Sequence, residues 1–300
     1  MDSRRSLPVA VVAAMRPRQW LKNALVFAAP LAAGDIFKPA VLVPSLLAFV
    51  AFCLISSSTY VINDLRDVES DRAHPVKCRR PIASGDLSPT LAAVLAAVLA
   101  IAALALALRA NVGLLAGLVC YFVFTTPYSL WLKNEPVIEL VLLAMGFLLR
   151  AIAGGVASEL PISQWFLIVA GFGSLFMAAG KRYSELTRGS REPEPGAPVV
   201  AMRRSLTGYT LSYLRFVWAI AAAVTITAYC LWAFEVGSAP SSAPWAAWSV
   251  LPFVMGLLRY AVDVDRGEAE APEDVVLHDW ALMATGVAWL VLFTLGSVGF

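Results

Sequence analysis

The sequence predicts an all-α, polytopic membrane protein with about nine transmembrane helices, and three observations support this fold class. The 300 residues are 59% hydrophobic and only 15% charged, whereas soluble domains are about 45–50% apolar and about 25% charged. The apolar residues fall into runs of about 20, the length that crosses the hydrocarbon core of a bilayer. The Lys and Arg residues concentrate between alternate runs, as the positive-inside rule describes.

The predicted spans cover most of the chain, so residues 1–300 are expected to form a single transmembrane domain. The first span is short, contains Pro30 and begins with Lys22 and Asn23, which indicates that it crosses only in part. Before it, Arg16 and Arg18 interrupt an apolar stretch that has no small-residue cleavage site, so an interfacial helix is predicted there and a signal peptide is rejected. The spans are 20–34, 40–62, 87–108, 112–131, 137–158, 164–182, 207–235, 245–262 and 280–299.

The charge distribution predicts the orientation in the inner (plasma) membrane. With the N-terminus inside, the outward loops contain only Lys38 and Arg109, so the basic residues gather on the cytoplasmic side. The inward loops 63–86, 183–206 and 263–279 are long, whereas the outward connections are short turns. Long charged loops on one side predict that the active site faces the cytoplasm. Loop 183–206 is rich in Pro, Gly and charge, and a lid is one interpretation of it.

An acidic motif follows the second span directly. Asn63 and three aspartates form the pattern NDxxDxxxD. If the helix continues, the three carboxylates share one face within about a third of a turn. Stacked carboxylates repel one another unless cations hold them, and hard oxygen ligands suit Mg²⁺ with a bound diphosphate. The alternative is that these acids lie in a solvated loop of mixed charge, and their helical spacing makes this alternative less favoured. The acids are Asp64, Asp67 and Asp71, and the basic residues that follow are Arg72, Lys77, Arg79 and Arg80.

This motif, placed after the second span of a chain with about nine helices, resembles that of the UbiA superfamily of intramembrane prenyltransferases. The resemblance covers essentially the whole chain and implies a UbiA-like helical bundle. It also implies that Asp64, Asp67 and Asp71 are catalytic residues that bind Mg²⁺ and, through it, the diphosphate of a donor.

A second motif after the sixth span departs from the superfamily pattern. Where typical members carry DxxxD, this chain reads MAAGKRYSELTRGSRE. Cationic donors, a hydroxyl and one acceptor at this place suit a phosphorylated, hydroxyl-bearing molecule such as a sugar phosphate. Two alternatives stay open: the basic pair serves only as a positive-inside anchor, or Glu185 pairs with Lys181 one turn away. The residues are Lys181, Arg182, Tyr183 and Glu185.

One basic residue, Arg150, lies well inside the fifth predicted span. A lone Arg there costs about 2.5–3.5 kcal/mol on insertion scales, so a polar cavity with a phosphate or carboxylate partner is predicted. Lys22 and Asn23, at the entry to the first span, are expected to face the same cavity. Gly154 and Gly155 are predicted to permit close helix packing and not to touch a ligand.

One branch of the superfamily, which serves actinobacterial cell-wall synthesis, is similar to this chain in two places. These are the sequence that stands in place of the second aspartate motif and the segment RPRQWLKNALVFAAPLA near the N-terminus. This resemblance implies Mg²⁺-dependent transfer of 5-phosphoribosyl from phosphoribosyl pyrophosphate to a polyprenyl (decaprenyl) phosphate, releasing pyrophosphate, in arabinan precursor synthesis. Membrane lipid is a further expected partner, nucleic acid is not, and a homo-oligomer stays open. The substrate-binding residues would be Lys22, Asn63, Lys77, Arg79, Arg80, Arg150, Lys181, Arg182, Tyr183 and Glu185.

Two other functions are considered. A UbiA-type prenyltransferase with a prenyl diphosphate donor and an aromatic or lipid acceptor would share the first motif, but the missing second aspartate motif argues against it. A transporter or channel would place charges along several spans and often contains an internal repeat. Only Arg150 is deeply placed here, with Glu139 and Arg215 nearer the span ends, and no repeat is evident.

Overall fold

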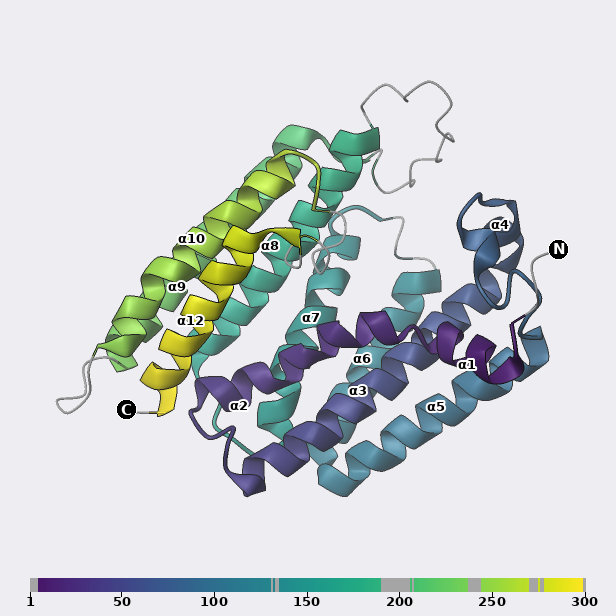
Figure 1. The fold of residues 1–300 in the computed structure, drawn as a ribbon, viewed down its shortest axis with the longest axis horizontal. Coiled ribbons are helices and arrows are strands. Elements are labelled where there is room, and N and C mark those ends of the chain that lie inside the picture. The colour runs from purple at the N-terminus through teal and green to yellow at the C-terminus, as the bar shows by residue number, and fades with distance from the viewer. Residues whose placement is uncertain are drawn as a thin grey trace.

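The computed structural model describes residues 5–130, 132, 135–189, 206, 208–236, 244–269, 275 and 278–298, and in these residues all regular structure is helical (Figure 1). The all-α class is therefore confirmed. The helices are α1 (Leu7–Met15), η1 (Pro17–Phe27), α2 (Ala28–Ala32), α3 (Pro39–Arg66), α4 (Val68–Ala73), η2 (Lys77–Arg79), α5 (Pro89–Ala110), α6 (Val112–Leu130), α7 (Ile138–Ala157), α8 (Gln164–Gly189), α9 (Leu211–Val236), α10 (Trp245–Asp265) and α12 (Trp280–Val298).

Seven of the described helices are long and apolar enough to cross a membrane: α3, α5, α7, α8, α9, α10 and α12. The apolar part of α6, Val112–Pro127, is shorter. Each predicted span after the first therefore corresponds to one observed helix. The predicted count of about nine exceeds the seven that meet the length and hydropathy criteria.

The predicted first span, 20–34, is not one α-helix. Arg16 adopts a left-handed conformation, with φ 53°, and separates α1 from η1, which is a 3₁₀-helix that leads into the short α2. The break has a local cause, because the residue before a proline is disfavoured in the α conformation and Pro17 follows Arg16. In Figure 1 these three segments form one bent rod that runs along α3. The interfacial helix predicted before the span is α1, whose Ala10 and Ala14 are buried.

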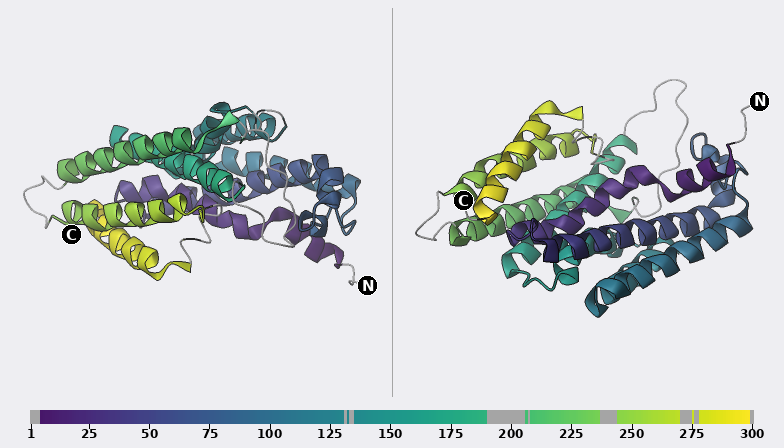
Figure 2. Two further views of the ribbon diagram at one scale, coloured as in Figure 1. Left: turned by 90° about the horizontal axis from the view of Figure 1, so that it is seen from above. Right: turned by 60° about the horizontal axis from the view of Figure 1, so that its bottom comes forward.

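Most helices pack against helices that are near them in the sequence. Figure 2 shows α3 and α5 on one side, α10 and α12 on the other, and α7 and α8 between them. One apolar core joins η1, α3, α5, α6 and α7, and a second joins α7 to α8, α9, α10 and α12. Helix α7 thus contributes a wall to both cores, and side chains on its two faces lie in different surroundings.

The crossing of α7 and η1 depends on glycine. A Cβ atom at Gly154 would lie against the backbone carbonyl oxygen of Val26, and one at Gly155 would lie 3.0 Å from the Cβ of Ala29. The two backbones approach closely because neither glycine carries a side chain. The predicted packing role of Gly154 and Gly155 is confirmed.

Two inward loops begin later than predicted. Helix α8 continues to Gly189 and α10 to Asp265, so Tyr183 and Glu185 lie on a helix and not in loop 183–206. Residues 190–205, on which the lid interpretation falls, lie outside the described residues, as do 270–274 and 276–277 of loop 263–279. Helices that alternate in direction bring the C-terminal ends of α3, α8 and α10 to the same end of the bundle (Figure 1).

Candidate active site

The acidic motif lies where α3 ends. Asp64 is in the last turn of α3, Asp67 is its C-cap with φ −89° and ψ 11°, and α4 begins at Val68. The helix therefore does not continue unbroken through the motif, and the condition for three carboxylates on one helix face is not met. Asp64 and Asp71 are both buried, at 2% and 3% exposure, whereas Asp67 is half-buried.

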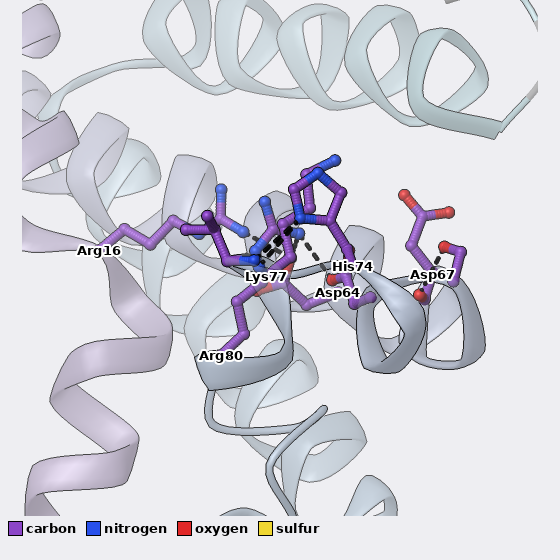
Figure 3. Close-up of polar contacts among 9 residues, drawn as sticks. Arg16, Asp64, Asp67, His74, Lys77 and Arg80 are labelled. Carbon is purple, nitrogen blue, oxygen red and sulfur yellow. Dashed lines mark hydrogen bonds and ion pairs between the residues drawn. The ribbon is translucent and has the colours of Figure 1, made fainter. Parts of the chain in front are cut away.

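Arg80 connects the two buried acids. Its NH1 nitrogen donates to Asp64 Oδ1 at 3.0 Å and to Asp71 Oδ2 at 2.7 Å. A second guanidinium, that of Arg16, donates from NH2 to Asp64 Oδ1 at 2.5 Å and lies over the Tyr60 ring. Figure 3 shows both arginines directed at Asp64, with the Asp67 side chain to one side. Charge-assisted contacts of this length are the strong class of hydrogen bond.

A short turn carries Arg80 back to the acids. The Nδ1 atom of His74 accepts the backbone N–H groups of Val76 and Lys77, at 3.1 and 3.3 Å, and so shapes the entry to η2. At the other end, the backbone N–H of Arg80 donates to Lys77 O at 2.9 Å. His74 is therefore a turn-forming residue in this structure, and the turn sets the position of Arg80.

The carboxylate oxygens of Asp64 and Asp71 are of the chemical type that binds Mg²⁺. No three His, Cys, Asp or Glu side chains gather closely enough to hold a metal ion among the described residues. However, the Asp64 and Asp71 carboxylates converge on one point, and a positively charged nitrogen stands there. Carboxylate oxygens are the ligands that Mg²⁺ takes, usually one or two of them with waters and substrate phosphates.

The other residues predicted at this first site lie around the acids. Lys77 and Arg79 are exposed on η2, and Arg72 donates from Nε to Ala83 O at 3.3 Å. Asn63 is half-buried one residue before Asp64 on α3. The predicted cluster of acids and bases at the mouth of the second span is therefore present as a group.

Arg150 lies in the interior of the bundle, 6% exposed. Its guanidinium donates to Asn23 Oδ1 and to Tyr121 OH, both at 2.7 Å, and to Gly146 O at 2.6 Å. It also lies over the Tyr121 ring, 4.7 Å from the centroid. These hydrogen-bond partners are neutral, so no carboxylate partner of Arg150 is found among the described residues, and the polar cavity and the phosphate partner stay predictions. Lys22, half-buried beside Asn23, donates to Gln19 Oε1 at 2.6 Å.

The second motif forms a buried ion pair that the sequence did not predict. Arg182, 1% exposed, donates from Nε and NH2 to the carboxylate of Glu139 on α7, at 2.6–2.9 Å, and Glu139 is fully buried. Its NH1 donates to Glu185 Oε2 at 2.5 Å. Two carboxylates thus bind the guanidinium that was predicted to hold a phosphate, and Glu185 pairs with Arg182.

Tyr183 lies in other surroundings than Arg182. The Tyr183 hydroxyl donates to Asp265 Oδ1 at 3.1 Å and accepts from Arg215 NH2 at 2.6 Å. Arg215 also donates to Asp265 at 2.9 Å, which links α8, α9 and α10. Lys181 is half-buried on α8. Arg182 and Glu185 are therefore paired on one face of α8, whereas Tyr183 contacts α9 and α10.

A further ion pair stands at this end of the bundle. Asp279 Oδ1 accepts the backbone N–H groups of Ala281 and Leu282, and so caps α12, while Arg259 donates to Asp279 Oδ2 at 2.6 Å. The Arg259 guanidinium holds the pKa of the Asp279 carboxyl below its ordinary value. Asp279 therefore stays ionised and continues to cap the helix in mildly acidic solution.

Sequence reasoning missed several polar residues of these clusters. Arg16 appeared only as an interruption of an apolar stretch, and Glu139 only as a charge near a span end. The signal that could have found them is the same for both: a charged residue at a predicted membrane boundary needs a partner. The residues not predicted in these roles are Arg16, Tyr121, Glu139, Arg215 and Asp265.

The fold and the site define a class, namely a helical membrane protein whose buried carboxylates and arginines meet at one end of the bundle. Residues 24–285 match the UbiA prenyltransferase family, and the chain belongs to that family. Among solved structures, a UbiA homolog from Archaeoglobus fulgidus bound to DMAPP and Mg²⁺ is similar, with a TM-score of 0.71 over 96% of this chain and 98% of that one. At 16% identity, this likeness concerns the fold.

Curated relatives are much more similar in sequence. The decaprenyl-phosphate phosphoribosyltransferase of Mycobacterium tuberculosis (strain H37Rv) is 47% identical over 289 residues, which cover 95% of this chain and 93% of the relative. The enzyme of the same name from Mycolicibacterium smegmatis is 45% identical over 306 residues, covering 98% and 93% of the two chains. The family expected from the acidic motif is thereby confirmed.

Proposed function

We propose that this protein transfers the 5-phosphoribosyl group of phosphoribosyl pyrophosphate to decaprenyl phosphate or a related polyprenyl phosphate, and releases pyrophosphate. The observation that carries the proposal is the 47% identity, over nearly the full length of both chains, to a relative named decaprenyl-phosphate phosphoribosyltransferase. The product would serve arabinan synthesis in the cell wall, and the enzyme is a pentosyltransferase.

The reaction forms one bond and breaks one bond. A phosphate oxygen of the lipid attacks the anomeric carbon of the ribose, and the bond from that carbon to the pyrophosphate oxygen breaks. The electron pair leaves with pyrophosphate. The nucleophile is already anionic at neutral pH, so the site needs no strong general base. That requirement agrees with a chain that has only two histidines, of which His74 accepts backbone N–H groups.

Asp64, Asp67 and Asp71 are the residues that would hold Mg²⁺. The metal would stabilise the negative charge that develops on the departing diphosphate. Support for this assignment comes from the two carboxylates that already converge on a cation and from the Mg²⁺-bound homolog of the same fold. Asn63, beside them, would contribute an amide to the donor diphosphate.

The exposed basic residues would hold the substrate phosphates. Lys77 and Arg79 lie on η2 at the edge of the acid cluster, where a diphosphate bound to the metal would come within their reach. Arg150 and Lys22 lie deeper between the helices and would stabilise the phosphate of the polyprenyl acceptor. A guanidinium whose partners are neutral keeps its full positive charge for an anion.

The second motif would bind the sugar through Lys181 and Tyr183. Arg182 is held by two carboxylates, so we assign it the task of fixing α7 against α8, and Glu185 the task of completing that pair. The Tyr183 hydroxyl, shared with Arg215 and Asp265, would face the ribose hydroxyls at the border of the site.

The site would face the cytoplasm from the plasma (inner) membrane. Lys and Arg residues gather at the end of the bundle that carries Asp64, Arg80 and Arg182, as the positive-inside rule expects for the cytoplasmic side. The soluble donor would enter from that side, and the isoprenoid tail of the acceptor would lie among the apolar helices.

The deciding experiment incubates the purified full chain in detergent with Mg²⁺, ribose-labelled phosphoribosyl pyrophosphate and decaprenyl phosphate. Label is expected to move into the organic phase, and to stay in the aqueous phase when the lipid is left out or Mg²⁺ is replaced by a chelator. A parallel reaction supplies a labelled prenyl diphosphate and an aromatic acid. Transfer in this second reaction alone would contradict the proposal.

A further inference from the structure

Arg80 occupies the place between two acids that a divalent cation would also favour. A single nitrogen, NH1, donates one hydrogen bond to Asp64 and one to Asp71, at 3.0 and 2.7 Å. Both carboxylates are almost fully buried, and two buried like charges at short range need positive charge between them. Arg80 supplies it here.

The surroundings of Arg80 differ from those of the two acids. The Arg80 side chain is 26% exposed, and it comes from the end of η2, in the turn that also carries the exposed Lys77 and Arg79. It can therefore turn outward without opening the bundle. Arg16 is placed otherwise: it contacts only Asp64 of the pair, lies over Tyr60 and belongs to the junction of α1 and η1.

We propose that Arg80 and Mg²⁺ alternate between Asp64 and Asp71. In this scheme Arg80 leaves the two carboxylates when Mg²⁺ binds, and its guanidinium then binds the diphosphate of the donor. The inference rests on the proposed function for the identity of the donor, but the exchange itself concerns only the cation and the two acids.

The charge balance predicts how metal and diphosphate affect each other. Asp64 and Asp71 carry two negative charges, and Arg16 and Arg80 balance them. When Mg²⁺ replaces Arg80, the released guanidinium has no carboxylate partner, so metal binding alone is weakened. A diphosphate provides that partner. Arg80 therefore couples the two ligands, and each increases the affinity for the other.

The first test uses the unaltered protein and an arginine-selective dicarbonyl reagent, with modification of each arginine measured by mass spectrometry. Saturating Mn²⁺, added without any phosphate compound, is expected to increase the modification rate of Arg80 several-fold and to leave that of Arg79 unchanged. Inorganic pyrophosphate added with Mn²⁺ is expected to protect Arg80 again. If Mn²⁺ leaves the Arg80 rate unchanged or lowers it, the exchange does not occur.

The second test measures Mn²⁺ binding by electron paramagnetic resonance. Arg80→Met removes the competing cation and is expected to bind Mn²⁺ about tenfold more tightly than the unaltered protein, because the two charge-assisted hydrogen bonds of Arg80 no longer have to be broken. The matched control is Arg79→Met, which removes the same charge one residue away and is expected to bind as the unaltered protein does. Unchanged or weaker binding by Arg80→Met, or an equal gain in both variants, would overturn the proposal.

Neither test depends on the phosphoribosyl acceptor or on turnover. If the unaltered protein exchanges Arg80 for Mn²⁺ but moves no ribose label into lipid, the exchange stands and the proposed function fails. If label is transferred but Mn²⁺ does not free Arg80, the function stands and the exchange fails.

Discussion

At the scale of single residues, each of three buried acids has an arginine as its partner. Asp64, Asp71 and Glu139 are 2%, 3% and 0% exposed, and each accepts a guanidinium hydrogen bond. The cost of burying a carboxylate is offset only where its partner is close and well aligned. The two sites differ in access, because the side chain of Arg80 is partly exposed and that of Arg182 is not.

The half-buried acid of the motif provides a test of metal binding. Asp67→Asn keeps the shape of the side chain and removes its charge, so it is expected to lower kcat by about 100-fold or more if Asp67 contributes to the Mg²⁺ site. The measurement is ribose-label transfer at saturating Mg²⁺. The matched control is Glu69→Gln, an exposed acid two residues away, which should retain nearly full turnover. Full turnover by Asp67→Asn would remove that residue from the metal assignment.

The second buried pair provides a test of stability. Glu139→Gln takes a carboxylate away from the buried Arg182 guanidinium, and removing one member of such a pair costs about 3–5 kcal/mol. A clearly lower unfolding temperature in detergent is expected. Glu185→Gln, which changes a partly exposed group, should have a smaller effect. In the double variant Glu139→Gln/Arg182→Met the loss should be partly recovered, and a purely additive loss would show that the two residues do not interact.

The residue scale also shows what the sequence could and could not predict. The acids and bases between Asp64 and Arg80 are near one another in sequence, so their proximity was predictable. Glu139 and Arg182 are 43 positions apart, on helices whose rotation about their own axes is decided by packing. No local pattern specifies which faces of α7 and α8 meet, and so the partner of Arg182 was not predictable.

At the scale of elements, hydropathy predicted the position of every long helix but not the ends. Helix α8 extends seven residues beyond its predicted span, because the backbone continues to make helical hydrogen bonds after the apolar residues stop. The first span, 20–34, was predicted as one segment, whereas a 3₁₀-helix ends at Phe27 and the short α2 follows it. The separate break before this span, at Arg16, has a local chemical cause in Pro17.

The crossing of α7 and η1 provides an element-scale prediction. Gly154→Ala places a methyl group against the Val26 carbonyl oxygen, so the two backbones must separate and the unfolding temperature in detergent is expected to fall. Gly117→Ala on α6 is the matched control, since nothing lies within 4 Å of its added Cβ. That variant should be neutral or stabilised by up to about 1 kcal/mol, because alanine favours a helix over glycine. Equal stability of the two variants would contradict the tight crossing.

At the scale of the whole molecule, the C-terminal ends of α3, α8 and α10 lie at one end of the bundle (Figure 1), and each carries a member of an ion pair. The overall fold was predictable because a membrane restricts the chain to helices long enough to cross it. The alternation of helix direction then brings Asp64 and Arg182 to the same end. Sequence could not give the shared role of α7, which lines both apolar cores.

The orientation in the membrane can be tested by labelling Cys78. It lies in the η2 turn near Arg80, whereas Cys53, Cys120 and Cys230 lie within α3, α6 and α9. A membrane-impermeant maleimide is expected to label Cys78 in inside-out vesicles and not in intact cells. The Cys78→Ser variant should lose this labelling. Labelling of Cys78 from outside intact cells would reverse the orientation and move the site to the other side of the membrane.

The arginines that pair with Asp64 and Asp71 affect whether the newly made protein needs a metal ion in order to fold. In a zinc finger the apoprotein stays unfolded until its ion arrives. Here Arg16 and Arg80 belong to the same chain as the acids they neutralise, so biogenesis in the bilayer does not have to wait for a divalent ion. On the proposed Mg²⁺ assignment, a cell short of magnesium would therefore accumulate an idle enzyme with its native fold, ready to be activated when the ion returns.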